Sequence, residues 1–232
     1  TANLLSDLVF EHEQTSSWVL RAYRRRESLI RAVKNKDLAG VMPHLMQLKK
    51  DNEEVDSAFI TNAKGILWAN YPVDRSAFNA DLSYRDWYRG VSGSWRPYVS
   101  NILLRVIREK DPAVFVAVPI FARRDKVTGV LVGTWRTVNL EKFIRRIPLE
   151  DGGQSITVVD RKGHIAYSSR FPAAGSLTRY PFFEAFETMR DRKEQSFSTP
   201  DPFAGWGRRY VSYATLDSIG WHVFAGRSGR SI

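Results

Sequence analysis

The side chains that most often carry catalysis or hold metals are scattered along this chain. There is no cysteine, and the four histidines, His12, His44, His164 and His222, lack the spacing of shared metal ligands. Carboxylates are plentiful but form no recognisable acid and base pair, and no catalytic-serine, phosphate-loop or metalloprotease motif occurs. We therefore expect a protein that is not an enzyme, with no metal site and no cofactor.

Basic residues outnumber acidic ones by 35 to 25, which gives a formal net charge of +10. Such an excess suits nucleic acid or an anionic surface as a partner. The densest basic run, at residues 21–26, falls on a predicted helix, and no nucleic-acid-reading motif surrounds it. We interpret it as the solvated face of that helix, so no nucleic-acid partner is predicted.

Two stretches look like the same small unit written twice. Residues 58–69 and 156–167 each hold an apolar run that ends at Asn62 or Asp160, turns through Lys-Gly and resumes as a second apolar run. This pattern is typical of a β-hairpin. A helix-like segment and two more apolar runs follow each hairpin. These runs cover residues 114–120 and 129–133 in the first copy, and 210–214 and 220–226 in the second. The chain is thus predicted to hold two tandem copies of one α+β module.

An amphipathic helix is predicted before the first hairpin. Apolar and small residues recur at three-, four- and seven-residue steps from Leu4 to about Val33, without Gly or Pro. They are Leu4, Leu8, Thr15, Trp18, Ala22, Leu29 and Val33. Roughly 30 helical residues would make one continuous rod of about 45 Å, long enough to span both modules. A second short helix is expected around residues 38–45.

The remaining segments indicate where the two modules meet and which residues form the core of the second module. Residues 81–89 read as a capped helical turn, 97–102 as a strand and 139–146 as a capped helix. Pro148 and the glycines at 152–153 mark a module boundary. The aromatic residues of the second module are interpreted as its own core, which leaves no ligand site there. They are Tyr167, Phe182, Phe183, Phe186, Tyr210, Tyr213 and Trp221.

In their order and spacing, these segments resemble the double Cache family (dCache, PAS-like double PDC) of extracytoplasmic sensor domains. The residues that carry the resemblance are Asp81-Leu-Ser-Tyr-Arg-Asp-Trp-Tyr88, Tyr98-Val-Ser100, Val118-Pro-Ile120 and Gly129-Val-Leu-Val-Gly133. The resemblance covers essentially the whole chain. It implies an α+β fold in which one long N-terminal helix carries two tandem PAS-like antiparallel-sheet modules, the first membrane-distal and the second membrane-proximal.

The same resemblance suggests a ligand site in the distal module. The amino-acid-binding branch of the family has an Arg-x-Trp-aromatic pattern, matched here by Arg85, Trp87 and Tyr88, which resemble the groups that hold a ligand carboxylate. Where that branch has acidic residues for the ligand amine, this chain has Tyr98-Val-Ser100 and Thr134, or Trp135 if the register differs by one. Trp68 is a further candidate wall. Core packing for Trp87 and Tyr88, and a surface position for Arg85, stay open as alternatives.

The expected chemistry of the ligand follows from this difference in the charged residues of the site. A guanidinium matches a carboxylate, whereas a buried ammonium with no carboxylate opposite it is costly. We therefore expect a small anionic ligand, an organic acid or other small carboxylate without an amine, held by Arg85, Trp87, Tyr88, Tyr98, Ser100 and Thr134, with Trp68 less certain.

The resemblance also implies the setting of the domain. It predicts the periplasmic or extracytoplasmic part of an inner-membrane receptor, such as a chemoreceptor, histidine kinase or cyclase, with flanking transmembrane helices absent from this chain. A homodimer through the N-terminal helix is possible in this arrangement. The predicted domains are residues 1–50 (helical stalk and second helix), 51–150 (distal module) and 151–232 (proximal module). The alternative is a cytosolic PAS-like interaction or nucleic-acid-binding module that uses its basic surface.

Overall fold

The chain folds into two compact units. The first unit comprises Glu13–Arg136, and the second comprises Thr137–Ile232 together with Thr1–His12. The computed structural model describes residues 18–105, 111–123, 126–138, 154–171, 177–191, 196–200 and 207–229. The helix expected at 139–146 and the boundary expected at 148–153 lie outside the described residues. So does most of the N-terminal segment on which a dimer contact was expected.

The helices of the first unit correct the prediction of one continuous N-terminal rod. Residues 18–23 are helical, the chain then turns, and α2 (Glu27–Asn35) starts from an extended Arg26. A second turn at Lys36 leads to α3 (Leu38–Asp51), whose first turn is capped by the Asp37 side chain accepting from Gly40 N. The prediction was therefore wrong between residues 24 and 26.

The physical reason for the break is the direction of the apolar side chains. Leu20 and Tyr23 are buried before the break and Leu29 is buried after it, whereas the predicted contact residue Trp18 is 68% exposed. On an unbroken helix Tyr23 and Leu29 would point about 120° apart. The turn brings both toward the interior, and it is held by the Tyr23 hydroxyl donating to Asp51 (2.8 Å).

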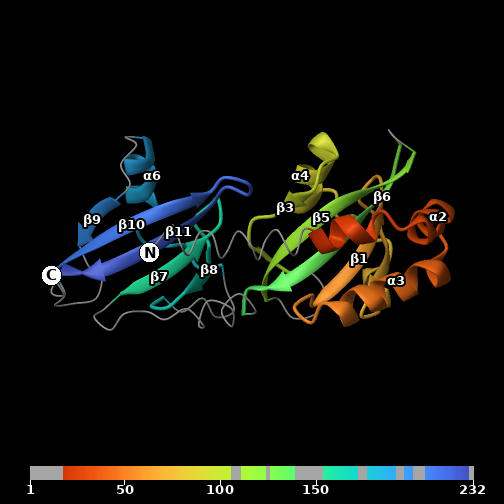
Figure 1. Ribbon diagram of the computed structural model, residues 1–232, viewed down its shortest axis with the longest axis horizontal. Coiled ribbons are helices and arrows are strands. Elements are labelled where there is room, and N and C mark those ends of the chain that lie inside the picture. The colour runs from red at the N-terminus through yellow and green to blue at the C-terminus, as the bar shows by residue number, and fades with distance from the viewer. Residues whose placement is uncertain are drawn as a thin grey trace. The chain divides into compact units, whose positions relative to one another are not determined.

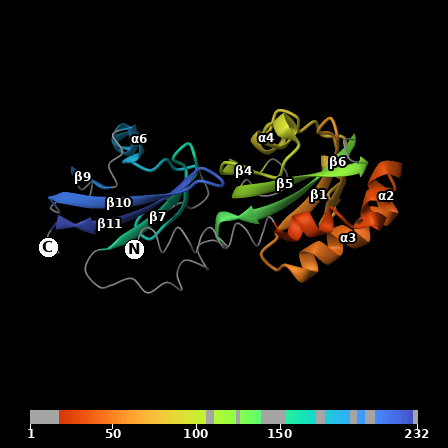
Figure 2. The same ribbon diagram turned by 45° about the horizontal axis from the view of Figure 1, so that its top comes forward.

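An antiparallel sheet forms the centre of the first unit. Its order is β2-β1-β6-β5-β3, with β4 also paired to β5. The strands are β1 (Ser57–Asn62), β2 (Leu67–Tyr71), β3 (Tyr98–Val99), β4 (Leu103–Leu104), β5 (Pro112–Arg123) and β6 (Lys126–Arg136). A short 3-10 helix, η1 (Arg75–Ala77), follows β2, and α4 (Asp86–Ser94) follows in turn. Helix α4 lies on one face of this sheet and α2 and α3 on the other (Figures 1 and 2).

The second unit repeats this topology with a five-stranded antiparallel sheet of order β8-β7-β11-β10-β9. Its elements are β7 (Ser155–Val159), β8 (Ile165–Ser168), α6 (Phe183–Asp191), β9 (Ser196–Pro200), β10 (Arg208–Leu216) and β11 (Trp221–Ser228). An aromatic cluster that includes Phe182, Phe183, Phe186 and Phe224 fills the space between this sheet and α6. Of the aromatic residues expected in this core, Tyr167 and Trp221 are buried but lie outside this cluster, and Tyr210 is exposed because it points to the other side of β10.

The two predicted hairpin turns are equivalent, residue by residue. Asn62 Oδ1 accepts from the amides of residues 64 and 66, and Asp160 Oδ1 accepts from those of residues 162 and 164. Gly65 and Gly163 both have positive φ, 85° and 79°, which a residue without a Cβ adopts without strain. The fold class and the duplication expected from the sequence are thereby confirmed.

Candidate functional site

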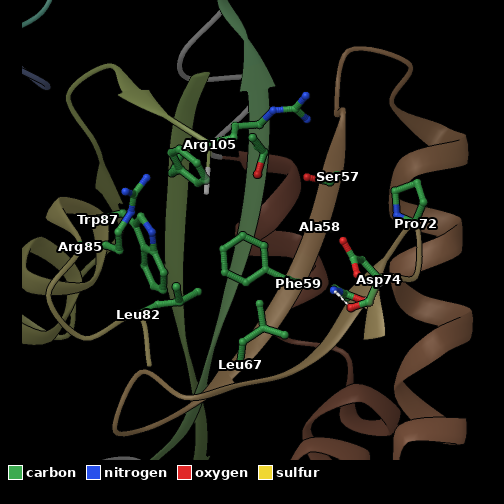
Figure 3. Close-up of a pocket in the computed structure, with 13 residues that line it drawn as sticks. Ser57, Ala58, Phe59, Leu67, Pro72, Asp74, Leu82, Arg85, Trp87 and Arg105 are labelled. Carbon is green, nitrogen blue, oxygen red and sulfur yellow. Dashed lines mark hydrogen bonds between the residues drawn. The ribbon is translucent and has the colours of Figure 1, made fainter. Parts of the chain in front are cut away.

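A small cavity lies in the first unit between the sheet and the segment that leads into α4. Its volume is about 70 Å³. The lining side chains are Ser57, Ala58, Phe59, Leu67, Asn70, Pro72, Asp74, Leu82, Arg85, Trp87, Arg105, Phe115 and Thr134. Figure 3 shows Arg85 and Trp87 on one side, Asp74 on the opposite side, and Ser57 with Arg105 at one end. The cavity therefore brings together segments that are far apart in the sequence.

The floor of the cavity is a row across three neighbouring strands. Ser57 on β1 pairs with Thr134 on β6, and Thr134 pairs in turn with Phe115 on β5. Because side chains alternate along a strand, these three project from the same face. Thr134 is 1% exposed, and its Oγ1 has no hydrogen-bond partner. The floor thus presents a buried hydroxyl toward the cavity.

Arg85 is positioned by the turn that precedes α4. Leu82 N donates to Gly65 O, and Asp81 Oδ1 accepts from Ser83 N (2.8 Å), so the segment is tied to the hairpin and bent just before the helix. The hydrogen bonds from Ser83 hold the pKa of Asp81 below its usual value, which keeps the carboxylate of this turn ionised. Arg85 itself is the N-cap residue of α4, with extended backbone.

The guanidinium of Arg85 is held in place and still has capacity to bind. One terminal nitrogen donates to Leu104 O (2.8 Å), and the group lies 5.7 Å from the centre of the Phe115 ring. Within the described part of the chain it forms no ion pair with a carboxylate. The side chain is half-buried at the cavity wall. Arg85 therefore provides a positive charge and unused N–H donors for an anionic group.

Trp87 forms the adjacent apolar wall. Its side chain is 1% exposed and meets Phe59 edge to face, with ring centres 5.5 Å apart. Leu67 and Leu82 complete this part of the lining. Trp87 therefore packs in the core and also borders the cavity, and its role in ligand binding stays a prediction.

Two charged residues of the cavity were not predicted from the sequence. Arg105 follows β4, is 8% exposed, and pairs tightly with Asp56, with Asp111 at 3.8 Å. Asp74 caps η1, where its Oδ1 accepts from Ser76 N (3.0 Å) and Ser76 Oγ (2.6 Å). No sequence motif points to Arg105, although Asp-x-Ser is a local cap signal that could have located the turn at Asp74.

Four of the predicted site residues do not line the cavity. The Tyr88 hydroxyl donates to Ala63 O (2.8 Å), and burial raises its pKa, so it acts as a neutral brace for the hairpin. Tyr98 packs over Gly90. Ser100 Oγ is buried and accepts from Phe115 N (3.0 Å). Trp68 is half-buried elsewhere on β2.

Thr134, rather than its neighbour Trp135, is the β6 residue at the cavity. The Trp135 ring lies over Gly133, on the side of the sheet where Leu20 packs. Successive residues of a strand face opposite sides, so Thr134 points toward α4. The sequence left Thr134 and Trp135 open as alternatives for this position, and Thr134 is the one that lines the cavity.

At the position equivalent to Arg85, the second unit has an aromatic residue instead of an arginine. Tyr180 N donates to Gly163 O as Leu82 N does to Gly65 O, which aligns the two segments with an offset of 98 residues. With that offset, Phe183 takes the place of Arg85, and its ring is 2% exposed in the aromatic core. A wider, open groove of about 680 Å³ lies near the Ser155 and Gly226 end of this sheet.

Metal-binding clusters and membrane-spanning helices are both missing from the part of the chain that the structure describes. Within the ranges given above, no group of three or more His, Asp or Glu side chains is arranged to hold a metal ion. None of the helices described is both long enough and apolar enough to cross a membrane.

Comparison with known protein families gives one match. A family model described as Cache domain (dCache_1) matches residues 1–229, which is nearly the entire chain. Among curated proteins, no similar sequence is found.

Solved structures with the same fold are numerous. The extracellular domain of a protein described as a histidine kinase, rpHK1S-Z16, has a TM-score of 0.75 at 16% identity, covering 100% of this chain and 94% of that one. The ligand-binding domain of the Pseudomonas fluorescens chemoreceptor CtaA, solved with L-isoleucine, has a TM-score of 0.74 at 14% identity, covering 99% and 90%. That of the Campylobacter jejuni chemoreceptor Tlp3, solved with L-valine, gives 0.71 at 14%, covering 99% and 90%.

Proposed function

Because the chain belongs to the Cache domain family, we propose that its first unit binds a small carboxylate in the cavity beside Arg85. The domain is an extracytoplasmic, non-catalytic sensor module of a membrane receptor, as expected from the sequence. The alternative of a cytosolic nucleic-acid-binding module is set aside, since nothing beyond the net charge favours it.

The observation that carries this proposal is the uncompensated guanidinium of Arg85. It lines a largely apolar cavity, and no described carboxylate pairs with it. A carboxylate ligand would give it a charge-assisted and partly bidentate hydrogen bond, roughly twice as strong as a neutral one. Arg105, the other cationic lining residue, already has Asp56 and Asp111 as partners. The net attraction for an anion is therefore concentrated at Arg85.

The size of the cavity favours a short ligand. One water molecule occupies roughly 10–15 Å³ of such space, so a volume of about 70 Å³ corresponds to a handful of water-sized atoms. This suits an acid of a few carbons. The CtaA and Tlp3 domains were solved with L-isoleucine and L-valine, which are bulkier and carry an amine.

The scarcity of carboxylates in the cavity lining favours an acid without an amine over an amino acid. Among the described residues, Asp74 is the only carboxylate that lines the cavity, and its Oδ1 already accepts two hydrogen bonds from Ser76. These hydrogen bonds use acceptor capacity of Asp74, so an ammonium beside it would recover less of its lost hydration than one facing an uncommitted carboxylate. We propose that this asymmetry selects small carboxylates without an amine.

A matched ligand panel tests this proposal. Thermal shift followed by titration calorimetry would compare acetate, propionate and L-lactate with glycine, L-alanine and L-valine. A ligand at 100 times its dissociation constant stabilises the folded state by about 2.7 kcal/mol, which is easily measured. Short acids should bind more tightly than the amino acids of equal chain length. Tighter binding of the amino acids would refute the proposed preference, and absence of binding by every compound would refute the carboxylate site.

A further inference from the structure

The end of the cavity away from Trp87 is polar. Thr134 Oγ1 is enclosed without a hydrogen-bond partner, and Ser57 lies opposite it on the neighbouring strand. Arg105 lies at this same end (Figure 3) and is bound to Asp56, the residue that precedes Ser57. Three hydrogen-bonding side chains thus meet at one small site.

This end offers hydrogen bonds without a net charge. The positive charge of Arg105 is balanced by the adjacent Asp56, while Asp111, 3.8 Å from Arg105, is itself paired with Arg136. A second anionic group here would meet the negative charge of Asp56 as well as the guanidinium, so it would gain little net attraction. A neutral oxygen would suffer no such repulsion, and it would give the Thr134 hydroxyl the partner that it lacks.

We propose that the ligand is a short carboxylic acid that carries a hydroxyl or oxo oxygen. Its carboxylate binds Arg85, and its second oxygen binds Thr134 at the polar end, with Ser57 and Arg105 around it. This inference rests on the proposed function and makes it more specific. Both ends lie within one cavity of about 70 Å³, so the two groups must be only a few atoms apart.

The expected specificity arises from the free-energy cost of a buried hydroxyl that has no hydrogen-bond partner. A site that holds a polar group ready for a ligand oxygen disfavours the analogue without that oxygen, because the group then stays buried and unsatisfied. Propionate would leave Thr134 Oγ1 in this state. L-lactate and pyruvate, which have the same carbon chain, would satisfy it.

The test compares these three acids on the wild-type protein and two variants. Thr134→Val replaces the hydroxyl by a methyl of the same shape. Thr61→Val is the matched control, because Thr61 is a fully buried threonine of the same sheet whose Oγ1 also has no partner but which does not line the cavity. Both variants should fold at least as well as wild type, since each loses an unpaired hydroxyl.

Calorimetry should show L-lactate or pyruvate binding wild type and Thr61→Val about tenfold more tightly than propionate does. In Thr134→Val this advantage should fall to within about twofold. Equal binding of propionate and both oxygenated acids to wild type would overturn the inference while leaving the carboxylate site intact. An advantage that survives in Thr134→Val would also overturn it. If no acid binds wild type, the proposed function fails and this inference fails with it.

Discussion

Replacing Arg85 by Ala removes the group on which the proposed site depends. A desolvated charge pair that loses one partner typically costs 2–5 kcal/mol of binding. Arg85 is half-buried and therefore partly screened by solvent, so we expect the lower part of that range, about 2–3 kcal/mol or about a 30- to 150-fold weaker affinity. Arg85→Lys keeps the charge but loses the planar fork, and should weaken binding by about tenfold.

The same change should cost little stability. In the folded protein the Arg85 guanidinium donates one hydrogen bond to Leu104 O and packs on the Phe115 ring, and Arg85→Ala removes both interactions. A hydrogen bond from a charged donor is worth about 1.5 kcal/mol when the group is half-exposed, so the melting temperature should fall by only about 3–6 °C. The matched control is Arg89→Ala, an exposed arginine of the same helix α4 that does not line the cavity.

Titration calorimetry of the three variants with the tightest acid of the panel decides the matter. Arg89→Ala should bind like wild type. The reasoning is refuted if Arg85→Ala binds within twofold of wild type, or if Arg89→Ala loses as much affinity as Arg85→Ala.

Three further predictions concern stability. Burial lowers the pKa of His222 to about 4 from 6.5. Between these two pH values the unfolded chain therefore binds a proton at His222 that the folded chain does not bind. Stability should then fall as the pH drops from 6.5 to 4, by about 3 kcal/mol in all, and urea titrations across this range should show a weaker dependence in His222→Phe. Gly163→Ala should destabilise by about 2–3 kcal/mol in the same assay, because φ is +79° and a Cβ would stand 2.4 Å from the Phe183 ring; an unchanged midpoint would show that this turn tolerates a side chain. Gly93→Ala, where a Cβ meets nothing within 4 Å inside α4, should instead stabilise by about 0.5–1 kcal/mol, and a loss would contradict the helical propensity argument.

Among the predicted site residues, the structure brings Arg85, Trp87 and Thr134 to the cavity and places Tyr88, Tyr98, Ser100 and Trp68 elsewhere. Their order along the chain was readable, but the direction of each side chain was not. Tyr88 is next to Trp87 on a helix, where successive residues point about 100° apart, so the two could not both face the cavity. Roles in ligand binding stay predictions until the titrations are done.

The N-terminal helix shows a similar limit. A repeat of three, four and seven residues identified helical sequence, but it chose Trp18 and Ala22 as contact residues, and both are exposed. Leu20 and Tyr23 are buried instead. Periodicity describes one helix in isolation. It does not show that two segments with different apolar faces need a turn between them before both can pack on the same sheet.

The sequence by itself determined the duplicated hairpins, because Asn62 and Asp160 bind amides only two and four residues away and each glycine supplies the positive φ that its own turn needs. Such interactions depend on neighbours in the chain and can be read locally. The cavity was decided by the tertiary structure. Ser57, Arg105 and Thr134 come from three separate segments, and pairing of β1 with β6 is what sets Ser57 opposite Thr134. The chemistry of that site depends on which side chains the sheet registers and helix packing bring together, and no local pattern records this.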